Sequence, residues 1–481
     1  MKPTPPFRGL RTKRLFILGL DCAAPDLVFS RWRSDLPNLT RLAEHGLSGE
    51  LQSCIPAITV PAWSCMLSGR DPGELGIYGF RNRADYSYEN RFIADSSYVK
   101  VDRIWDYLTR DRKRSVIIGV PQTYPVRPLR GQLIADFLTP GIDHEFTYPD
   151  ELKAEILEIA PDYDVDVPQF RTEHKEHLLD QIWQMTKKRF AVVDHMLGKR
   201  WDLFMLMEIG VDRIHHGFWS FHDPQHRRYE AGNPYENAIH DYYVFIDQKL
   251  GEWLERIGED TAVLVVSDHG AKRMEGGICI NEWLWRQGLL RFQEDPKDGT
   301  VTPFSKLTVD WSRTRAWGDG GYYGRIFVNV AGREPKGVVP QREYETFRDD
   351  LAESIRAIPG PAGEDLSSQV FKPEQIYRAV NGAAPDLMVY FGDLLWRSVG
   401  SLGHGGVHTY ANDTGPDVCN HAQNGMFILY HPEAQFNGAR LKAAQLFDIT
   451  PTVLEMFSIR RPPSVQGRSL MQQFEEGRGL E

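Results

Sequence analysis

Four short apolar runs, each bounded by polar turns, constrain the fold of this chain most strongly. They span residues 14–20 (RLFILGL), 114–120 (RSVIIGV), 202–209 (DLFMLMEI) and 261–267 (TAVLVVS). Both faces of each run are apolar, which is typical of strands buried inside a parallel sheet. A fifth run, 425–431 (GMFILYH), indicates another strand.

Amphipathic segments separate these runs. Apolar residues recur at spacings of three and four in segments 37–46, 102–110, 174–197 and 237–258, which predicts helices. Segment 448–457 has the pattern of a capped helix. Because strand and helix alternate, we predict a doubly wound α/β fold, with a mostly parallel sheet and helices on both faces.

The regular alternation is interrupted between residues 271 and 415. This region mixes helix-like segments, a strand-like segment and turn-rich connections such as GDGGYYG. We therefore place the α/β core in residues 1–270 and 416–481. We expect residues 271–415 to form an inserted cap that covers the sheet and contributes some core elements.

Composition and charge exclude several classes of function. The chain has 481 residues, 41% of them hydrophobic, and a net charge of -10 with a pI near 5.9. It therefore lacks the basic character expected for binding nucleic-acid polymers or acidic membrane surfaces. Its five cysteines are scattered, which favours a reducing compartment, and the first apolar run is too short to span a membrane. We expect a cytoplasmic protein, and the sequence leaves its oligomeric state open.

Acidic residues and histidines follow the predicted strands. Asp21 follows the first run, and Asp268 and His269 follow the run at 261–267. Asp212 and His216, four residues apart in the segment DRIHH, share one face if that segment is helical. The carboxyl ends of parallel strands line one crevice, so these groups should converge there.

Each of these residues also has an ordinary role open to it, such as capping a helix or lying at the surface. Together, however, three carboxylates in one crevice repel one another, and divalent cations are the usual remedy. Carboxylate and imidazole ligands suit Zn²⁺ or Mn²⁺ better than Ca²⁺. The sequence thus predicts a metal site.

Thr59 lies two residues before Pro61, at the expected start of a helix. A hydroxyl in this position either caps the helix or lies near its positive end, where an anion can bind. The residue alone does not decide between these roles.

The ordered motifs resemble a known family. Asp21, the block TVPAW followed by SGRDPGELGI, DRIHH, SDHG and NHAQNGMFILY together resemble the alkaline phosphatase superfamily, in particular type I phosphodiesterase/nucleotide pyrophosphatase-like phosphohydrolases. The C-terminal segment DITPTVLEMFSIRRPPSVQGRSL extends the resemblance over nearly the whole chain.

The resemblance implies a site with two divalent metal ions, Zn²⁺ first and Mn²⁺ as the alternative. One ion would bind Asp21, Asp268, His269 and the Thr59 hydroxyl. The other would bind Asp212, His216 and His421, with His404 and His408 as rivals for the last position. His421 precedes its strand, so that strand must run against its neighbours or the loop must fold back.

The same resemblance implies that Thr59 is the nucleophile. Metal coordination lowers the pKa of its hydroxyl, and attack on phosphorus gives a phosphothreonine that water then hydrolyses. Two metal ions roughly 4 Å apart suit such in-line displacement. Ser64 and Ser68 are alternative hydroxyls, but both fall inside the predicted helix.

The chain also departs from relatives of this family. Sulfatases carry cysteine or serine and then arginine where this chain has Thr59 and Trp63, which argues against a sulfatase. The pyrophosphatases have an asparagine at the position of Phe80. The candidates for contacting the phosphoryl group in its place are Asn82, Arg81, Arg213, Lys272 and Arg273.

We therefore predict a hydrolase of phosphodiesters or phosphomonoesters that acts on a small-molecule phosphate ester. Extra cations near the site would favour monoesters, which carry more negative charge than diesters. Two other functions stay open on the same scaffold. One is a phosphomutase or phosphotransferase, and the other is a catalytically idle metal- or ligand-binding protein.

Overall fold

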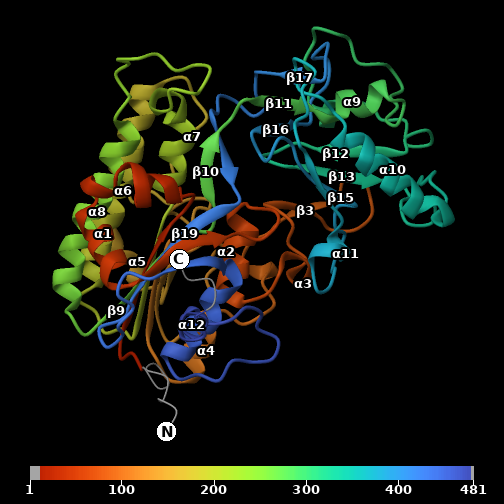
Figure 1. Ribbon diagram of the computed structural model, residues 1–481. Coiled ribbons are helices and arrows are strands. Elements are labelled where there is room, and N and C mark those ends of the chain that lie inside the picture. Colours follow the sequence, from red (N-terminus) through yellow and green to blue (C-terminus); the bar gives the residue numbers. More distant parts are fainter. Residues whose placement is uncertain (1–10, 478–481) are drawn as a thin grey trace.

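The computed structural model describes residues 11–477, and its centre is a nine-stranded sheet with helices on both faces (Figure 1). The strand order is β20-β2-β19-β9-β1-β8-β5-β6-β7. The four predicted apolar runs form its fully buried parallel centre, as β1 Leu15–Leu20, β5 Ser115–Ile118, β8 Leu203–Glu208 and β9 Ala262–Val266. The predicted doubly wound, mostly parallel α/β fold is confirmed.

The register of the central strands aligns their carboxyl ends. Leu20 of β1 pairs with Glu208 of β8, and Gly19 of β1 pairs with Val266 of β9. Residues just beyond these strands therefore reach one edge of the sheet. Gly19 also permits close packing of the helix above it, because a Cβ there would lie 2.5 Å from Cη2 of Trp63.

The outer strands change direction. β19 is antiparallel to both β9 and β2, β20 is parallel to β2, and β7 is antiparallel to β6. These strands are β2 Leu47–Gln52, β6 Gly131–Ile134, β7 Thr147–Tyr148, β19 Asn424–Tyr430 and β20 Arg440–Gln445. Because β19 is reversed, the residues before it reach the same edge as the residues after β1 and β9.

Two helical layers enclose this sheet (Figure 1). One layer contains α1 Pro37–His45, α5 Leu152–Ile159, α6 Lys175–Met196, α7 Gly210–His222 and α8 Ala238–Ile257. The other contains α2 Thr59–Ser68, α4 Ile104–Arg110 and α12 Ile449–Met456, with α3 Pro72–Leu75 and α13 Leu470–Glu475 beside them. Within residues 11–477, no helix combines the length and apolarity needed to cross a membrane.

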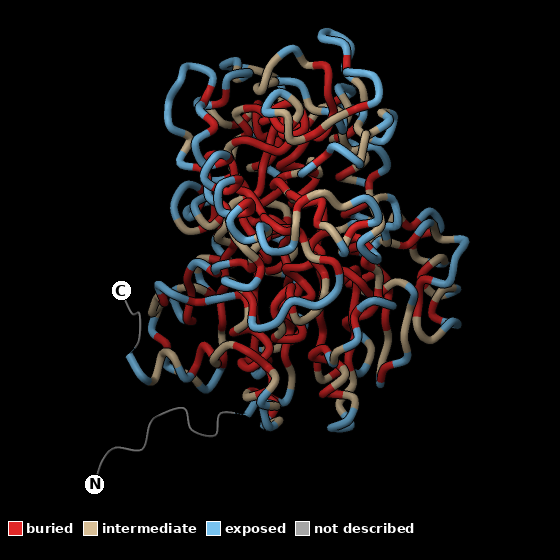
Figure 2. Tube along the Cα trace, turned by 90° about the vertical axis from the view of Figure 1, so that its right-hand side faces the viewer, coloured by how far each residue is buried: buried red, intermediate tan, exposed pale blue. Residues whose placement is uncertain are grey.

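Residues 276–409 build a second unit with its own hydrophobic cluster. It contains an antiparallel sheet of order β12-β13-β15-β14 and a smaller sheet of order β16-β11-β17. Figure 2 shows buried chain inside both units. The elements are β11 Gly276–Cys279, α9 Ile280–Arg286, β12 Ala316–Asp319, β13 Gly324–Val328, α10 Tyr344–Arg356, β14 Gln369–Phe371, α11 Pro373–Ile376, β15 Leu387–Tyr390, β16 Trp396–Val399 and β17 His408–Thr409.

Two short ribbons lie outside these sheets. β10 Gly270–Arg273 pairs with β18 Cys419–Ala422, which sets His421 opposite Ala271. β3 Arg81–Arg83 pairs with β4 Arg91–Ile93. In the first ribbon, the segment that follows β9 pairs with the segment that precedes β19. Both segments lie at the carboxyl edge of the central sheet.

Candidate metal centre

The parallel strands β1 and β9 bring a first group of ligands together. Asp21, Asp268 and His269 follow the ends of these strands and are fully buried. His269 Nε2 lies 3.2 Å from Asp268 Oδ2 and 3.8 Å from Asp21 Oδ1. Asp268 Oδ1 accepts a hydrogen bond of 3.1 Å from the backbone N–H of Cys22. This first cluster forms as expected from the strand ends.

Helix α7 and strand β18 bring together a second group. Asp212 and His216 lie one helical turn apart, and His216 Nε2 is 3.2 Å from Asp212 Oδ1. His421 Nε2 lies 3.3 Å from His216 Nε2 and 3.8 Å from Asp212 Oδ1. His215 points elsewhere, with Nε2 3.3 Å from the hydroxyl of Tyr243. The rivals His404 and His408 contact Ser401 and the carbonyl of Pro359 instead.

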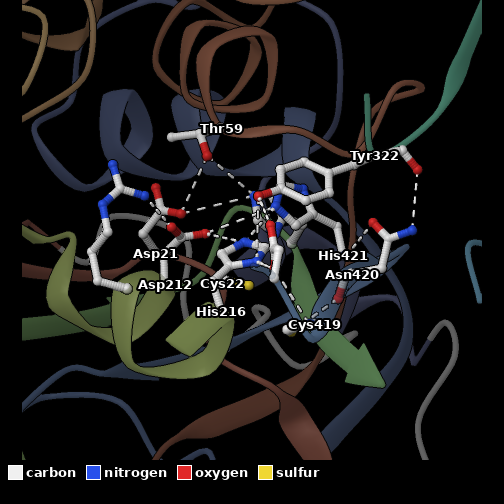
Figure 3. Close-up of polar contacts among 12 residues, drawn as sticks. Asp21, Cys22, Thr59, Asp212, His216, Tyr322, Cys419, Asn420 and His421 are labelled. Atoms are coloured by element: carbon white, nitrogen blue, oxygen red, sulfur yellow. Dashed lines mark hydrogen bonds and ion pairs between the residues drawn. The ribbon is translucent and has the colours of Figure 1, made fainter. Parts of the chain in front are cut away.

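Thr59 is the first residue of α2, and its hydroxyl points toward the ligand cluster (Figure 3). Its hydroxyl donates to Asp21 Oδ1 at 3.3 Å and lies 3.4 Å from His269 Nε2. The N-cap position is occupied by Ile58, so Thr59 is not the cap of this helix. The hydroxyl is therefore directed toward the ligand cluster at the positive end of a ten-residue helix.

All three cluster histidines are oriented in the same way. Nδ1 of His216 bonds to Asp417 Oδ1 at 2.8 Å, that of His421 to the carbonyl of Ala57 at 2.9 Å, and that of His269 to the carbonyl of Gly270 at 3.2 Å. An acceptor at Nδ1 selects the tautomer whose Nε2 carries a free lone pair. The three Nε2 atoms thus face the carboxylates as ready metal ligands.

The electrostatics of the cluster also call for cations. Burial, and then the neighbouring Asp212, raise the pKa of Asp21 well above its usual value. Burial and Asp21 do the same to the pKa of Asp268, whose Oδ2 has no hydrogen-bond partner among the described residues. Burial acts to raise the pKa of Asp212 too, but His216 and Arg213 hold it well below its usual value. An orphaned carboxylate oxygen beside inward-facing imidazoles fits divalent cations.

The ligand atoms fall into two sets, and within each set they lie within 4.8 Å of one another. One set is Asp21, Asp268 and His269. The other is Asp212, His216 and His421, together with Cys22, which the sequence analysis did not select. The Sγ of Cys22 bonds to the carbonyl of Gly270 at 3.4 Å, and burial raises the pKa of its thiol well above the usual value. Its position directly after Asp21 is the sequence signal that could have identified it.

A cavity of about 280 Å³ opens onto Thr59, Asp212 and His421. Phe80 lines this cavity, and so do Arg81 and Arg213 among the residues considered for phosphoryl contact.

The remaining candidates are not part of the cavity wall. The Asn82 side chain accepts from the backbone N–H of Tyr78 at 2.7 Å and donates to the carbonyl of Gly79 at 2.8 Å, so it holds its own loop. Lys272 pairs with Asp393 at 2.8 Å. Arg273 pairs with Glu275 at 2.5 Å.

Three further cavity or cluster residues were not found from the sequence. Asp417 is fully buried and binds His216, while Arg171 Nε donates to the other oxygen of Asp417 at 3.1 Å. Arg397 of β16 lines the cavity wall. Arg171 and Asp417 lie in irregular segments, and Arg397 lies in a short strand between irregular segments. None of these segments shows a periodic pattern in its sequence. Trp63, noted only as a departure from sulfatases, donates its indole N–H to Asp21 Oδ2 at 2.7 Å.

The comparisons with known proteins identify the family and the fold. The profile of the type I phosphodiesterase / nucleotide pyrophosphatase family matches residues 15–417. This match defines the chain as a phosphoric ester hydrolase. The chain belongs to the type I phosphodiesterase / nucleotide pyrophosphatase family, whose members are metal-dependent.

Solved structures share the fold. Human ectonucleotide pyrophosphatase / phosphodiesterase 5 matches with 14% identity and a TM-score of 0.54, over 97% of this chain and 100% of its own. Phosphonoacetate hydrolase from Sinorhizobium meliloti 1021, in complex with phosphonoacetate, matches with 16% identity and a TM-score of 0.59, over 93% of this chain and 96% of its own. No curated protein sequence matches the chain.

Proposed function

We propose that this protein hydrolyses small phosphate esters through a covalent phosphothreonine at Thr59, in a centre that holds two divalent metal ions. One observation carries the proposal: the Thr59 hydroxyl lies at a helix start and contacts Asp21 and His269 of the first ligand set, which adjoins the second set through the stacked rings of His269 and His421. We assign Asp21, Asp268, His269 and Thr59 to one ion. Asp212, His216 and His421 are assigned to the other. The donor set favours Zn²⁺, with Mn²⁺ as the alternative.

Bound divalent ions would lower the pKa of the Thr59 hydroxyl and of water, and would stabilise negative charge on the leaving oxygen. Thr59 Oγ attacks phosphorus, so that a new O–P bond forms while the bond to the leaving alcohol breaks. The electron pair departs with the leaving oxygen, which takes up a proton equivalent to the one lost by Thr59. Water then attacks the phosphothreonine from the opposite side and restores the hydroxyl.

Arg213 supports the phosphoryl group in this proposal. Its guanidinium is held by two bonds to Asp166, at 2.8 and 2.7 Å, and it also contacts Asp212. It lines the cavity beside Thr59, where it can donate to a phosphoryl oxygen. This contact replaces the donor that Phe80 cannot supply.

The second unit completes the cavity. It contributes Gly320, Tyr322, Arg325 and Arg397 to the wall that faces Thr59. We propose that this unit acts as a cap that limits access of water and of large substrates. The cytoplasmic location stays a prediction.

Thr59→Ala tests the mechanism. The wild-type protein, with its metal content measured, is assayed on 4-nitrophenyl phosphate, bis(4-nitrophenyl) phosphate and 4-nitrophenyl sulfate. We expect hydrolysis of at least one phosphate ester and none of the sulfate. The variant should lose turnover on the order of 1000-fold or more while still binding metal.

Ser64→Ala is the matched control, because Ser64 lies on the same helix and bonds to Gln122 instead of the cluster. Mass spectrometry of acid-quenched wild-type enzyme should detect phosphate on the peptide that contains Thr59. Normal turnover by Thr59→Ala would contradict the mechanism. Transfer of phosphate to an added alcohol with little release to water would instead identify a phosphotransferase, and metal binding without any turnover would identify a binding protein.

A further inference from the structure

The cavity above Thr59 is strongly cationic. Its lining contains one carboxylate, that of Asp212, and five guanidinium groups, those of Arg81, Arg171, Arg213, Arg325 and Arg397. A single phosphoryl group beside two metal ions does not require so many cations. The additional guanidinium groups therefore indicate the charge of the alcohol part of the substrate.

Two of these arginines already have carboxylate partners near the ligand clusters. Arg213 bonds to Asp166 and contacts Asp212. Arg171 bonds to Asp417 at 3.1 Å and to the hydroxyl of Tyr322 at 2.5 Å. These two groups help to position the metal ligands, because Asp417 and Asp212 both contact His216.

The other three arginines are incompletely paired with carboxylates. The side chain of Arg397 is 2% exposed, its Nε has no hydrogen-bond partner among the described residues, and its carboxylate neighbour Asp413 lies 3.7 Å away. Its Nη1 donates to the hydroxyl of Thr414 at 3.1 Å. A buried guanidinium with incomplete pairing is costly unless a ligand supplies the missing anion.

Arg325 and Arg81 also have no carboxylate of their own. Arg325 lies 3.3 Å from Asp319, but Asp319 also accepts two bonds from Arg91, at 2.9 and 2.5 Å. The exposed side chain of Arg81 makes no hydrogen bond or ion pair within residues 11–477. One carboxylate thus serves two guanidinium groups while a third has none.

Two of the four aromatic rings that line the cavity, those of Phe170 and Tyr322, already pack against other side chains. The guanidinium carbons of Arg171 and Arg213 each lie 4.3 Å from the ring centroid of Phe170. The ring of Tyr322 lies 4.8 Å from that of His216 and 4.4 Å from that of His421. Neither Phe170 nor Tyr322 is therefore available as an open stacking platform for a nucleobase.

We propose that the alcohol part of the substrate is small and carries a second negative charge, held by Arg397, Arg325 and Arg81. A carboxylate and a second phosphate share the required chemistry, since both accept paired bonds from guanidinium groups. The cavity volume of about 280 Å³ suits a compact ester of this kind. This inference rests on the proposed hydrolytic function and specifies its substrate class.

The test compares three esters: propyl phosphate, phosphoglycolate and propane-1,3-diol bisphosphate. Each is supplied as the free ester and with a methyl group added to the reacting phosphate, and the released alcohol is measured by mass spectrometry. We expect kcat/KM to be about 10-fold higher or more for a charged ester than for propyl phosphate. A preference for phosphoglycolate identifies a carboxylate, and a preference for the bisphosphate identifies a second phosphate.

Arg397→Gln should lower the ratio of kcat/KM for the preferred charged ester to that for propyl phosphate by about 10-fold. Arg81→Gln, which changes an exposed side chain without a hydrogen-bond partner within residues 11–477, should lower the same ratio. Arg313→Gln is the matched control, because Arg313 belongs to the second unit and its side chain is 68% exposed. An unchanged ratio in both cavity variants, or no preference in the wild type, would overturn the proposal.

Calorimetric binding of the same esters to metal-loaded Thr59→Ala separates this proposal from the hydrolytic one. If charged esters bind about 10-fold more tightly than propyl phosphate, but the wild type turns none of them over, the hydrolytic function fails while the anion site stands. If the wild type hydrolyses all three esters with equal efficiency and Thr59→Ala binds them equally, the anion site fails while hydrolysis stands.

Discussion

Asp417→Asn is the substitution that best tests how the ligand cluster is held together. The carboxylate of Asp417 is fully buried, and its Oδ1 receives the Nδ1 hydrogen of His216 at 2.8 Å. Its Oδ2 accepts from the hydroxyl of Tyr322 at 2.8 Å. Asparagine keeps the size of the side chain but removes the charge that fixes and polarises the imidazole.

The expected loss follows from the lost charge. A hydrogen bond to a buried charged group contributes about 1.5–3 kcal/mol. At about 1.4 kcal/mol for each factor of ten, the metal affinity of the His216 cluster should fall by about 10- to 100-fold. The cluster formed by Asp21, Asp268 and His269 does not contact Asp417, so its affinity should stay unchanged.

The measurement is a competition titration of the metal-free protein against a fluorescent chelator. It is made at alkaline pH because Asp417 and Asp212, acting against burial, raise the pKa of His216 to about 9, so that protons compete with the metal below that value. We expect two binding steps in the wild type and a selective weakening of one step in the variant.

Asp393→Asn is the matched control. Asp393 pairs with Lys272, its side chain is 60% exposed, and its φ of 50° is one that asparagine adopts readily. Circular dichroism of the metal-free proteins establishes that both variants are folded. Two unchanged binding steps in folded Asp417→Asn would refute the role given to this carboxylate.

Two further predictions concern stability. Removal of the metal ions by a chelator should lower the unfolding temperature. Burial and neighbouring carboxylates raise the pKa of Asp21 and Asp268, so their charged forms are unfavourable without cations. At a free ion concentration of 100 times the Kd, binding adds about 2.7 kcal/mol per site to the free energy of unfolding. Scanning calorimetry before and after Zn²⁺ is returned measures this, and an unchanged unfolding temperature would contradict it. Burial and Arg31 lower the pKa of His222 to about 4 in the folded protein, whereas the unfolded value is about 6.5. The free energy of unfolding therefore has its full contribution from neutral His222 above about pH 6.5. As the pH falls toward 4, this contribution is lost, by up to about 3 kcal/mol. Denaturant unfolding across this range should show a weaker pH dependence for metal-free His222→Gln than for metal-free wild type, and identical slopes would count against the assignment.

The parts of the structure that follow a sequence period were predictable. Runs such as 202–209 and 261–267 are apolar on both faces, and a parallel sheet with helices on both sides is the fold that buries them. Helix α7 was not among the predicted helices, but the spacing of Asp212 and His216 places both on one face once that segment is helical. One acid of each ligand group, Asp21 and Asp212, could therefore be predicted because it lies near the end of a predicted strand.

The supporting residues were not predictable in the same way. Arg171 and Asp417 lie 246 positions apart in the chain, and their bond depends on how two irregular segments meet. Arg397 becomes part of the cavity only because β16 packs beside β11 in the second unit. Asn82 looked like a possible phosphoryl contact, but its amide is used by the backbone of its own loop, a demand that sequence spacing does not reveal.

The position of His421 shows how strand direction decides which residues meet. Asp21 and Asp268 follow parallel strands, whereas His421 precedes β19, so in an all-parallel sheet it would lie at the opposite edge. β19 is antiparallel to β9, with Phe427 opposite Val266, and its beginning therefore lies where β9 ends. The stacked rings of His269 and His421, with centroids 3.9 Å apart, are the direct consequence. One reversed strand thus places a histidine from the C-terminal part of the chain beside acids from the N-terminal strand, and the second ligand group depends on that reversal.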